Sequence, residues 1–192
     1  MILHRNFLTI RYYKQGERMM HRFKFITLVC TLLPFYAHSG GNPDFVKFPE
    51  SYQQAFTQYD TANRANQTQV AKFYANDIAI ASYKKGEEAT PGSVVVMEIY
   101  ETKKDAAGKI ISDKEGMFEI EKLAAVAVME KRSDWDKTFS QENRTGDWGF
   151  AVYNPDGTPK SNDLNCVQCH TPLKDQDYLF SFQKLVDFAR KN

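Results

Sequence analysis

Residues 93–102 read SVVVMEIYET, and this β-branched run predicts a β-strand. Alternate side chains of a strand point to opposite faces, so Val95, Met97 and Ile99 share one face. The other face carries Val94, Val96, Glu98 and Tyr100. We expect Glu98 to be a solvated residue of this strand.

Two more strands are predicted after this one, at 122–131 (KLAAVAVMEK) and 147–154 (DWGFAVYN), although the alanines of the first would also suit a helix. Turn-forming residues follow the first and third strands, at 105–110 (DAAGKI) and 154–158 (NPDGT). The charged runs at 84–88 and 130–137 are expected to be exposed loop ends.

Helices are predicted on both sides of the strands. Residues 48–66 and 67–86 are interpreted as two helices, the second capped near Asn66–Thr68 and ending at Gly86. Residues 177–192 form an amphipathic pattern that predicts a closing helix. Strands in the middle and helices at both ends predict an α+β fold with an antiparallel sheet as its core.

The first 39 residues have the layout of a secretory signal. From Met20, basic residues precede a short apolar run and a small-residue site after Ser39, while residues 1–19 are interpreted as an over-extended start. The run is too short for a permanent membrane span, and Val29 before Cys30 does not fit a lipoprotein anchor. We therefore expect residues 40–192 to be one secreted domain without a stable membrane anchor.

The charge balance excludes one class of partner. The chain has 192 residues, with 25 basic and 24 acidic side chains. Residues 40–192 keep 19 basic and 23 acidic side chains, a net charge of −4. This balance argues against nucleic-acid binding.

Cysteine and histidine are concentrated in one motif. The chain has three cysteines and four histidines, but residues 40–192 keep only Cys166, Cys169 and His170, within CVQCH. A structural zinc site needs four ligands, and only Asp163, Asp175 or Asp177 could complete it.

Two further alternatives for the cysteine pair also fit poorly. A thioredoxin-type dithiol needs a strand-to-helix turn, whereas a turn-rich loop precedes Cys166. A disulfide between Cys166 and Cys169 would close a very short loop and stabilise little.

Attachment of a c-type haem accounts for every member of CVQCH. Cys166 and Cys169 lie about one helical turn apart and can bind the two vinyl groups of one haem, while His170 can ligate its iron. The sequence thus predicts one haem c per chain on a C-terminal haem-binding helix. Such attachment takes place outside the cytoplasmic membrane, so we expect a periplasmic protein.

The order of sheet first and haem motif last, with PGSVVVMEIYE, DWGFAVYNPDG and CVQCH, resembles the cytochrome P-460 / cytochrome c′-beta family over roughly residues 45–190. The resemblance implies a periplasmic homodimer with one haem c per chain on an antiparallel sheet. It also implies a proximal histidine and an open distal face. Some members oxidise hydroxylamine, and others bind nitric oxide or similar small ligands.

Carried over by residue, the resemblance matches Cys166, Cys169 and His170. Hydroxylamine-oxidising members carry a lysine that cross-links to the haem, and the matching position here is Met97. No distal arginine occurs near residues 71–77, where Lys72 is the nearest basic residue. The resemblance therefore points to the c′-beta side.

Several apolar residues are candidates for the haem pocket. Met97 is expected to pack in the sheet and line the pocket, with iron ligation as its alternative; Met117 and Met129 are weaker candidates of the same kind. Phe150 and Trp148 could pack on the distal face, or belong to the ordinary core.

Three functions remain open. The first is binding of nitric oxide or a comparable small ligand at an open distal site. The second is oxidation of hydroxylamine or peroxide, and the third is electron transfer with His/Met ligation. No catalytic residue and no redox partner can be identified from the sequence.

Overall fold

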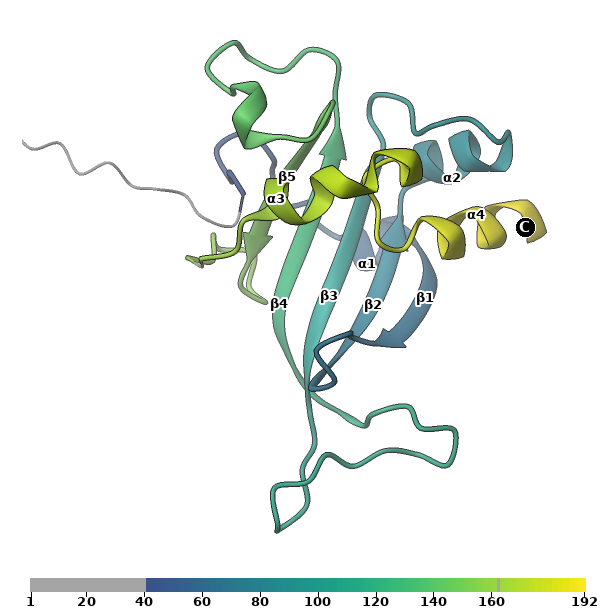
Figure 1. The fold of residues 1–192 in the computed structure, drawn as a ribbon, viewed down its shortest axis with the longest axis vertical. Helices are drawn as coiled ribbons and strands as arrows, with labels where there is room; N and C mark the ends of the chain where they lie inside the picture. The colour runs from purple at the N-terminus through teal and green to yellow at the C-terminus, as the bar shows by residue number, and fades with distance from the viewer. Residues whose placement is uncertain (1–40, 162) are drawn as a thin grey trace, which may run out of the picture. The chain divides into compact units, whose positions relative to one another are not determined.

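An antiparallel sheet of five strands forms the core of the computed structural model, which describes residues 41–161 and 163–192 (Figure 1). Its order is β1-β2-β3-β4-β5, so each strand pairs with its neighbours in sequence. The strands are β1 Thr57–Asn63, β2 Gln69–Ala75, β3 Val94–Thr102, β4 Ile120–Lys131 and β5 Trp148–Tyr153. The predicted signal region, 1–39, lies outside the described residues.

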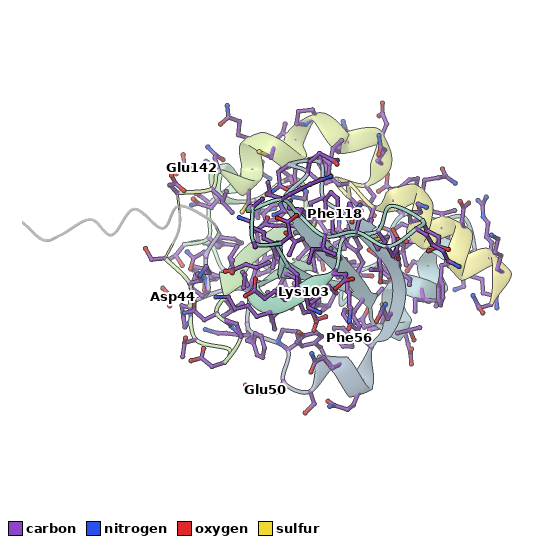
Figure 2. The ribbon with its side chains drawn as sticks, turned by 90° about the horizontal axis from the view of Figure 1, so that it is seen from below. Asp44, Glu50, Phe56, Lys103, Phe118 and Glu142 are labelled. Atoms are coloured by element: carbon purple, nitrogen blue, oxygen red, sulfur yellow. The ribbon has the colours of Figure 1, made fainter. Side chains whose placement is uncertain are left out.

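Helices cover both faces of the sheet (Figures 1 and 2). The short α1 (Tyr52–Ala55) packs on one face, where Tyr52 joins the cluster built around Val96 and Val126. The other helices are α2 (Asp77–Lys84), α3 (Cys166–His170), η2 (Thr171–Gln176) and α4 (Phe182–Lys191), with η1 (Gln141–Asn143) in the β4–β5 loop. Helices α2 and α4 bury their apolar side chains in a second cluster with Val95 and Phe150.

The prediction of an α+β fold with an antiparallel sheet is confirmed, and so are the three predicted strands. The two predicted faces of β3 are also correct. Val95 and Ile99 are buried on the face of α2 and α4, and Val96 is buried on the face of α1.

The prediction of two helices over 48–66 and 67–86 is wrong for most of its length. Strands β1 and β2 occupy these segments, and residues 64–68 form the turn between them. Only α1 and α2 are helical, and α2 is capped by Asn76, whose side chain accepts a hydrogen bond from Ala79 N. The strands form because β2 pairs with β3 along its whole length, and this pairing overrides weak local propensity.

The closing helix is shorter than predicted. Helix α4 begins at Phe182, and residues 177–181 form a loop. Asp177 and Tyr178 both have positive φ angles, 47° and 62°, which a helix does not allow. In the described part of the chain, every helix is too short or too polar to cross a membrane.

Two charged residues predicted at the surface are buried, and each has polar partners. Glu98 is 0% exposed and accepts hydrogen bonds from four side chains: Tyr52, Gln53, Tyr74 and Tyr100. Lys131, within the charged run 130–137, is 9% exposed and pairs with Asp177. Both lie on strands at positions where the sheet is covered, so burial follows from the fold and not from their local sequence.

Candidate functional site

The CVQCH motif folds into one short helix, α3. Asn165 caps it by accepting a hydrogen bond from Gln168 N at 2.9 Å, which fixes the first turn. Cys166 is half-buried against the main core and Cys169 is exposed, and both are free thiols. Burial raises the pKa of Cys166 to about 11. The two cysteines therefore lie one turn apart on α3; Cys166 lines the cavity described below, and Cys169 does not.

The His170 ring is oriented by the loop that follows α3 and η2. Its Nδ1 lies 2.6 Å from the carbonyl oxygen of Tyr178, and because a carbonyl can only accept, Nδ1 carries the proton. Burial lowers the pKa of His170, more than the hydrogen bond to Tyr178 raises it, so the ring is neutral at pH 7. A neutral ring protonated at Nδ1 presents its Nε2 lone pair, which is the form that ligates iron.

An apolar cavity of about 100 Å³ lies beside His170 and Cys166. Four directly paired residues, one from each of β2 to β5, form a row in its floor: Phe73, Met97, Ala127 and Val152. The Phe150 ring lies 4.8 Å from the His170 ring on one side, and Phe180 lies 5.0 Å away on another. His170 is thus surrounded by aromatic and aliphatic side chains.

The structure brings together most of the residues selected from the sequence. Met97, Met129 and Phe150 line the cavity with Cys166 and His170. Trp148 does not line it; the indole is fully buried and donates its Nε1 hydrogen to Asp177.

Two other candidates lie elsewhere. Met117 is in the hairpin between β3 and β4, where its backbone N–H donates to Asp113. Lys72 faces away from the cavity, with its ammonium 5.1 Å from the centre of the Tyr100 ring. Neither residue contributes to the cavity.

Several contributors to the site were not predicted from the sequence, among them Phe73, Tyr178 and Phe180. Phe73 was assigned to a helix, so its position opposite Met97 was hidden. Tyr178 acts through its backbone carbonyl, which no side-chain pattern can reveal. Phe180 is 66% exposed beside His170, and nothing in its local sequence distinguishes it from the other phenylalanines of the C-terminal segment.

The donor set fits a covalently bound haem. Two free thiols one turn apart and a neutral histidine with an available Nε2 are the groups that haem c attachment uses, and the lining is apolar. The described residues hold no group of three or more His, Cys, Asp or Glu that could bind a metal ion. The cavity is smaller than the roughly 300–1,000 Å³ of most cofactor sites, so it would enclose only part of a haem.

A comparison with protein-family models agrees with this donor set. The model described as Cytochrome P460 matches residues 49–181, which include all five strands, α3 and His170. A search of curated proteins gave no match.

Proposed function

Because the chain belongs to the cytochrome P460 family, a family of haem proteins, we propose that it is a periplasmic c-type cytochrome that binds nitric oxide or a similar small ligand. In this proposal Cys166 and Cys169 hold one haem by thioether bonds, and His170 is its axial ligand. The site opposite His170 is open to the small ligand. Bound haem would supply the iron, and the protein supplies attachment, orientation and an apolar surrounding.

The observation that carries the proposal is the composition of the cavity. Among the described residues that line it, only His170 and Cys166 are titratable, and both are assigned to the haem. The only other polar side chain is that of Ser181. Oxidation of hydroxylamine requires removal of protons, and this lining offers no further acid or base for that work. An uncharged diatomic ligand needs none.

The residue at position 97 also favours ligand binding over oxidation. Met97 lines the cavity at the position where, by resemblance, hydroxylamine-oxidising members carry the cross-linking lysine. A thioether has no amine and cannot form that bond. We therefore favour ligand binding over the hydroxylamine- or peroxide-oxidising alternative.

The test is spectroscopy and ligand titration of the purified haem-loaded protein. We expect a five-coordinate ferrous spectrum, rapid uptake of nitric oxide and carbon monoxide, and slow turnover of hydroxylamine. A wild-type protein that oxidises hydroxylamine at rates typical of enzymes, about 1–10³ s⁻¹, would contradict the proposal.

Electron transfer is a second candidate, because the thioethers of Met97 and Met129 line the same cavity. Methionine opposite histidine gives a low-spin carrier with a raised potential. Under this alternative, the ferrous spectrum is six-coordinate, and Met97→Ala or Met129→Ala converts it to five-coordinate. Under the first proposal, both variants keep the wild-type coordination.

The proposal includes a location and an assembly state. The signal-like segment before Gly40 and haem attachment outside the cytoplasm support a periplasmic protein. The family resemblance supports a homodimer. Fractionation of cells and light scattering of the purified protein test the two points, and a cytoplasmic haem-free monomer would contradict both.

A further inference from the structure

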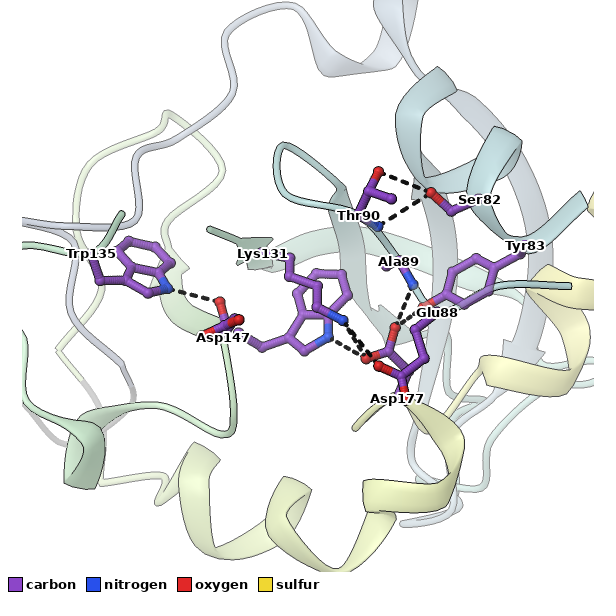
Figure 3. A network of polar contacts seen from close by, with 10 residues as sticks. Ser82, Tyr83, Glu88, Ala89, Thr90, Lys131, Trp135, Asp147 and Asp177 are labelled. Atoms are coloured by element: carbon purple, nitrogen blue, oxygen red, sulfur yellow. Dashed lines mark hydrogen bonds and ion pairs between the residues drawn. The ribbon is translucent and has the colours of Figure 1, made fainter. Parts of the chain in front are cut away.

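One buried carboxylate outside the cavity joins four parts of the fold. Asp177 is 4% exposed, and its two oxygens accept four hydrogen bonds (Figure 3). One oxygen accepts from Lys131 Nζ at 2.9 Å and Trp148 Nε1 at 3.0 Å. The other accepts from Tyr83 Oη at 2.9 Å and Ala89 N at 2.8 Å. The side chain therefore attaches the loop after η2 to α2, β4 and β5.

The backbone at Asp177 adopts a conformation that needs such support. Asp177 and Tyr178 both lie in the left-handed region, with φ of 47° and 62°. Residues other than glycine rarely adopt it, and two in succession persist only where the surroundings impose them. Two backbone hydrogen bonds help, from Asp177 N to Lys174 O and from Tyr178 N to Leu173 O.

The Tyr178 ring is held as well. A methyl group added at Gly146 would lie only 2.9 Å from Cε2 of this ring, so the β4–β5 loop packs closely against it. Tyr178 is therefore fixed at its side chain by Gly146 and at its backbone through Asp177. Its carbonyl oxygen, directly after these two attachments in the chain, accepts the Nδ1 proton of His170.

This hydrogen bond matters for the proposed cofactor, and the inference rests on the function proposed above. A hydrogen bond from Nδ1 fixes the ring orientation and tautomer of a ligating histidine and increases its basicity. We propose that Asp177 is the positioning residue of the axial ligand: held by Lys131 and Trp148, it fixes the Tyr178 carbonyl and so sets how strongly His170 donates to the iron.

The test is resonance Raman spectroscopy of the five-coordinate ferrous protein, with the reduction potential as a second readout. In Asp177→Asn, the amide NH₂ replaces one carboxylate oxygen and faces hydrogen-bond donors, so part of the hydrogen-bond network around residue 177 is lost. We expect its iron–histidine stretching frequency to shift down and its potential to shift up, because a weaker donor stabilises ferric iron less. Tyr83→Phe deletes one donor oxygen, keeps the ring packing, and should shift both readouts less in the same directions.

Glu98→Gln is the matched control. Glu98 is an equally buried carboxylate with four donors, but it lies on the opposite face of the sheet. It should lower the melting temperature and leave the iron–histidine frequency unchanged. Wild-type frequencies in both Asp177→Asn and Tyr83→Phe would overturn the inference and leave the proposed function standing. If Asp177→Asn does not fold, Tyr83→Phe decides alone. A wild type without an iron–histidine mode would overturn the proposed function and this inference with it.

Discussion

Replacing Glu98 by Gln tests the polar cluster on the face of the sheet opposite the cavity. The carboxylate accepts from Tyr52 and Gln53 on one oxygen, at 2.8 and 2.6 Å, and from Tyr74 and Tyr100 on the other, at 3.0 and 2.7 Å. A glutamine keeps one acceptor oxygen and turns an NH₂ group toward two of the donors. Two charge-assisted hydrogen bonds are lost.

The expected magnitude follows from these contacts. Hydrogen bonds to a charged group contribute about 1.5–3 kcal/mol each, so two lost bonds cost about 3–6 kcal/mol. A neutral amide costs less to bury than a carboxylate, so the substitution recovers a few kcal/mol of the desolvation free energy. We expect a net loss of about 2 kcal/mol in the free energy of unfolding, which lowers the melting temperature by about 4–8 °C in a domain of this size.

The loss should depend on pH in a defined direction. Burial alone would raise the pKa of Glu98, but the hydrogen bonds from Tyr100, Gln53, Tyr52 and Tyr74 together lower it below its ordinary value of 4.5. A lowered pKa contributes stability that is present above pH 4.5 and is lost as the pH falls through the folded-state value. The difference between wild type and Glu98→Gln should therefore be largest at neutral pH and shrink in acid.

Urea unfolding at several pH values between 3 and 8 measures this difference. Glu101→Gln is the control, because Glu101 lies on the same strand in an exposed pair with Lys122 and should cost at most about 1 kcal/mol. Equal stability of the Glu98 variant and wild type at every pH would refute the reasoning. So would a loss that grows as the pH falls.

Of three other predictions, two concern the site and one concerns packing on the opposite face of the sheet. Changing Cys166 and Cys169 together to Ser should make the haem extractable by acidified organic solvent; an extractable haem in the wild type would contradict covalent attachment. The wild type should show an ordinary haem c Soret band, whereas Met97→Lys, treated with peroxide, should gain a red-shifted band and the mass of a haem–lysine bond. A cross-linked wild type would move the oxidising function to first place. Gly149→Ala should lower the free energy of unfolding by about 1–3 kcal/mol, because its added methyl would lie 2.7 Å from Val46 and 2.9 Å from Trp135. An unchanged melting temperature in a thermal scan would contradict this prediction, because it would mean that the neighbouring side chains move aside at no cost.

The sequence predicted the parts of the fold whose side chains repeat with a clear period. The alternation at Val95, Met97 and Ile99 identified β3 and its two faces correctly. The strands β1 and β2 were not predicted: the β1 segment TQYDTAN has no apolar period and becomes a strand by pairing with β2, which itself pairs with β3. Pairing partners far apart in sequence are not encoded in a local pattern.

The residues of the site also fall into those that the sequence predicted and those that it did not. CVQCH is a chemical motif, so its three side chains could be selected directly from the sequence. Asp177 could be considered only as an isolated acidic residue, since its role depends on four donors from α2, β4, β5 and the loop after α2. Glu98 was misjudged for the same reason: its tyrosine partners come from three different elements.

The topology has a consequence for how the protein matures. All five strands precede α3 and pair only with neighbours in sequence, so the sheet needs no contact with the segment that follows it and has a lower contact order than a sheet with crossovers. Under the proposed covalent attachment, we therefore expect the sheet to form first, so that haem would be attached to a chain whose sheet is already folded. Cys166 is then already half-buried. The rate of maturation should follow how often residues 163–192 open locally from the sheet, and hydrogen exchange in this segment should predict it better than global stability does.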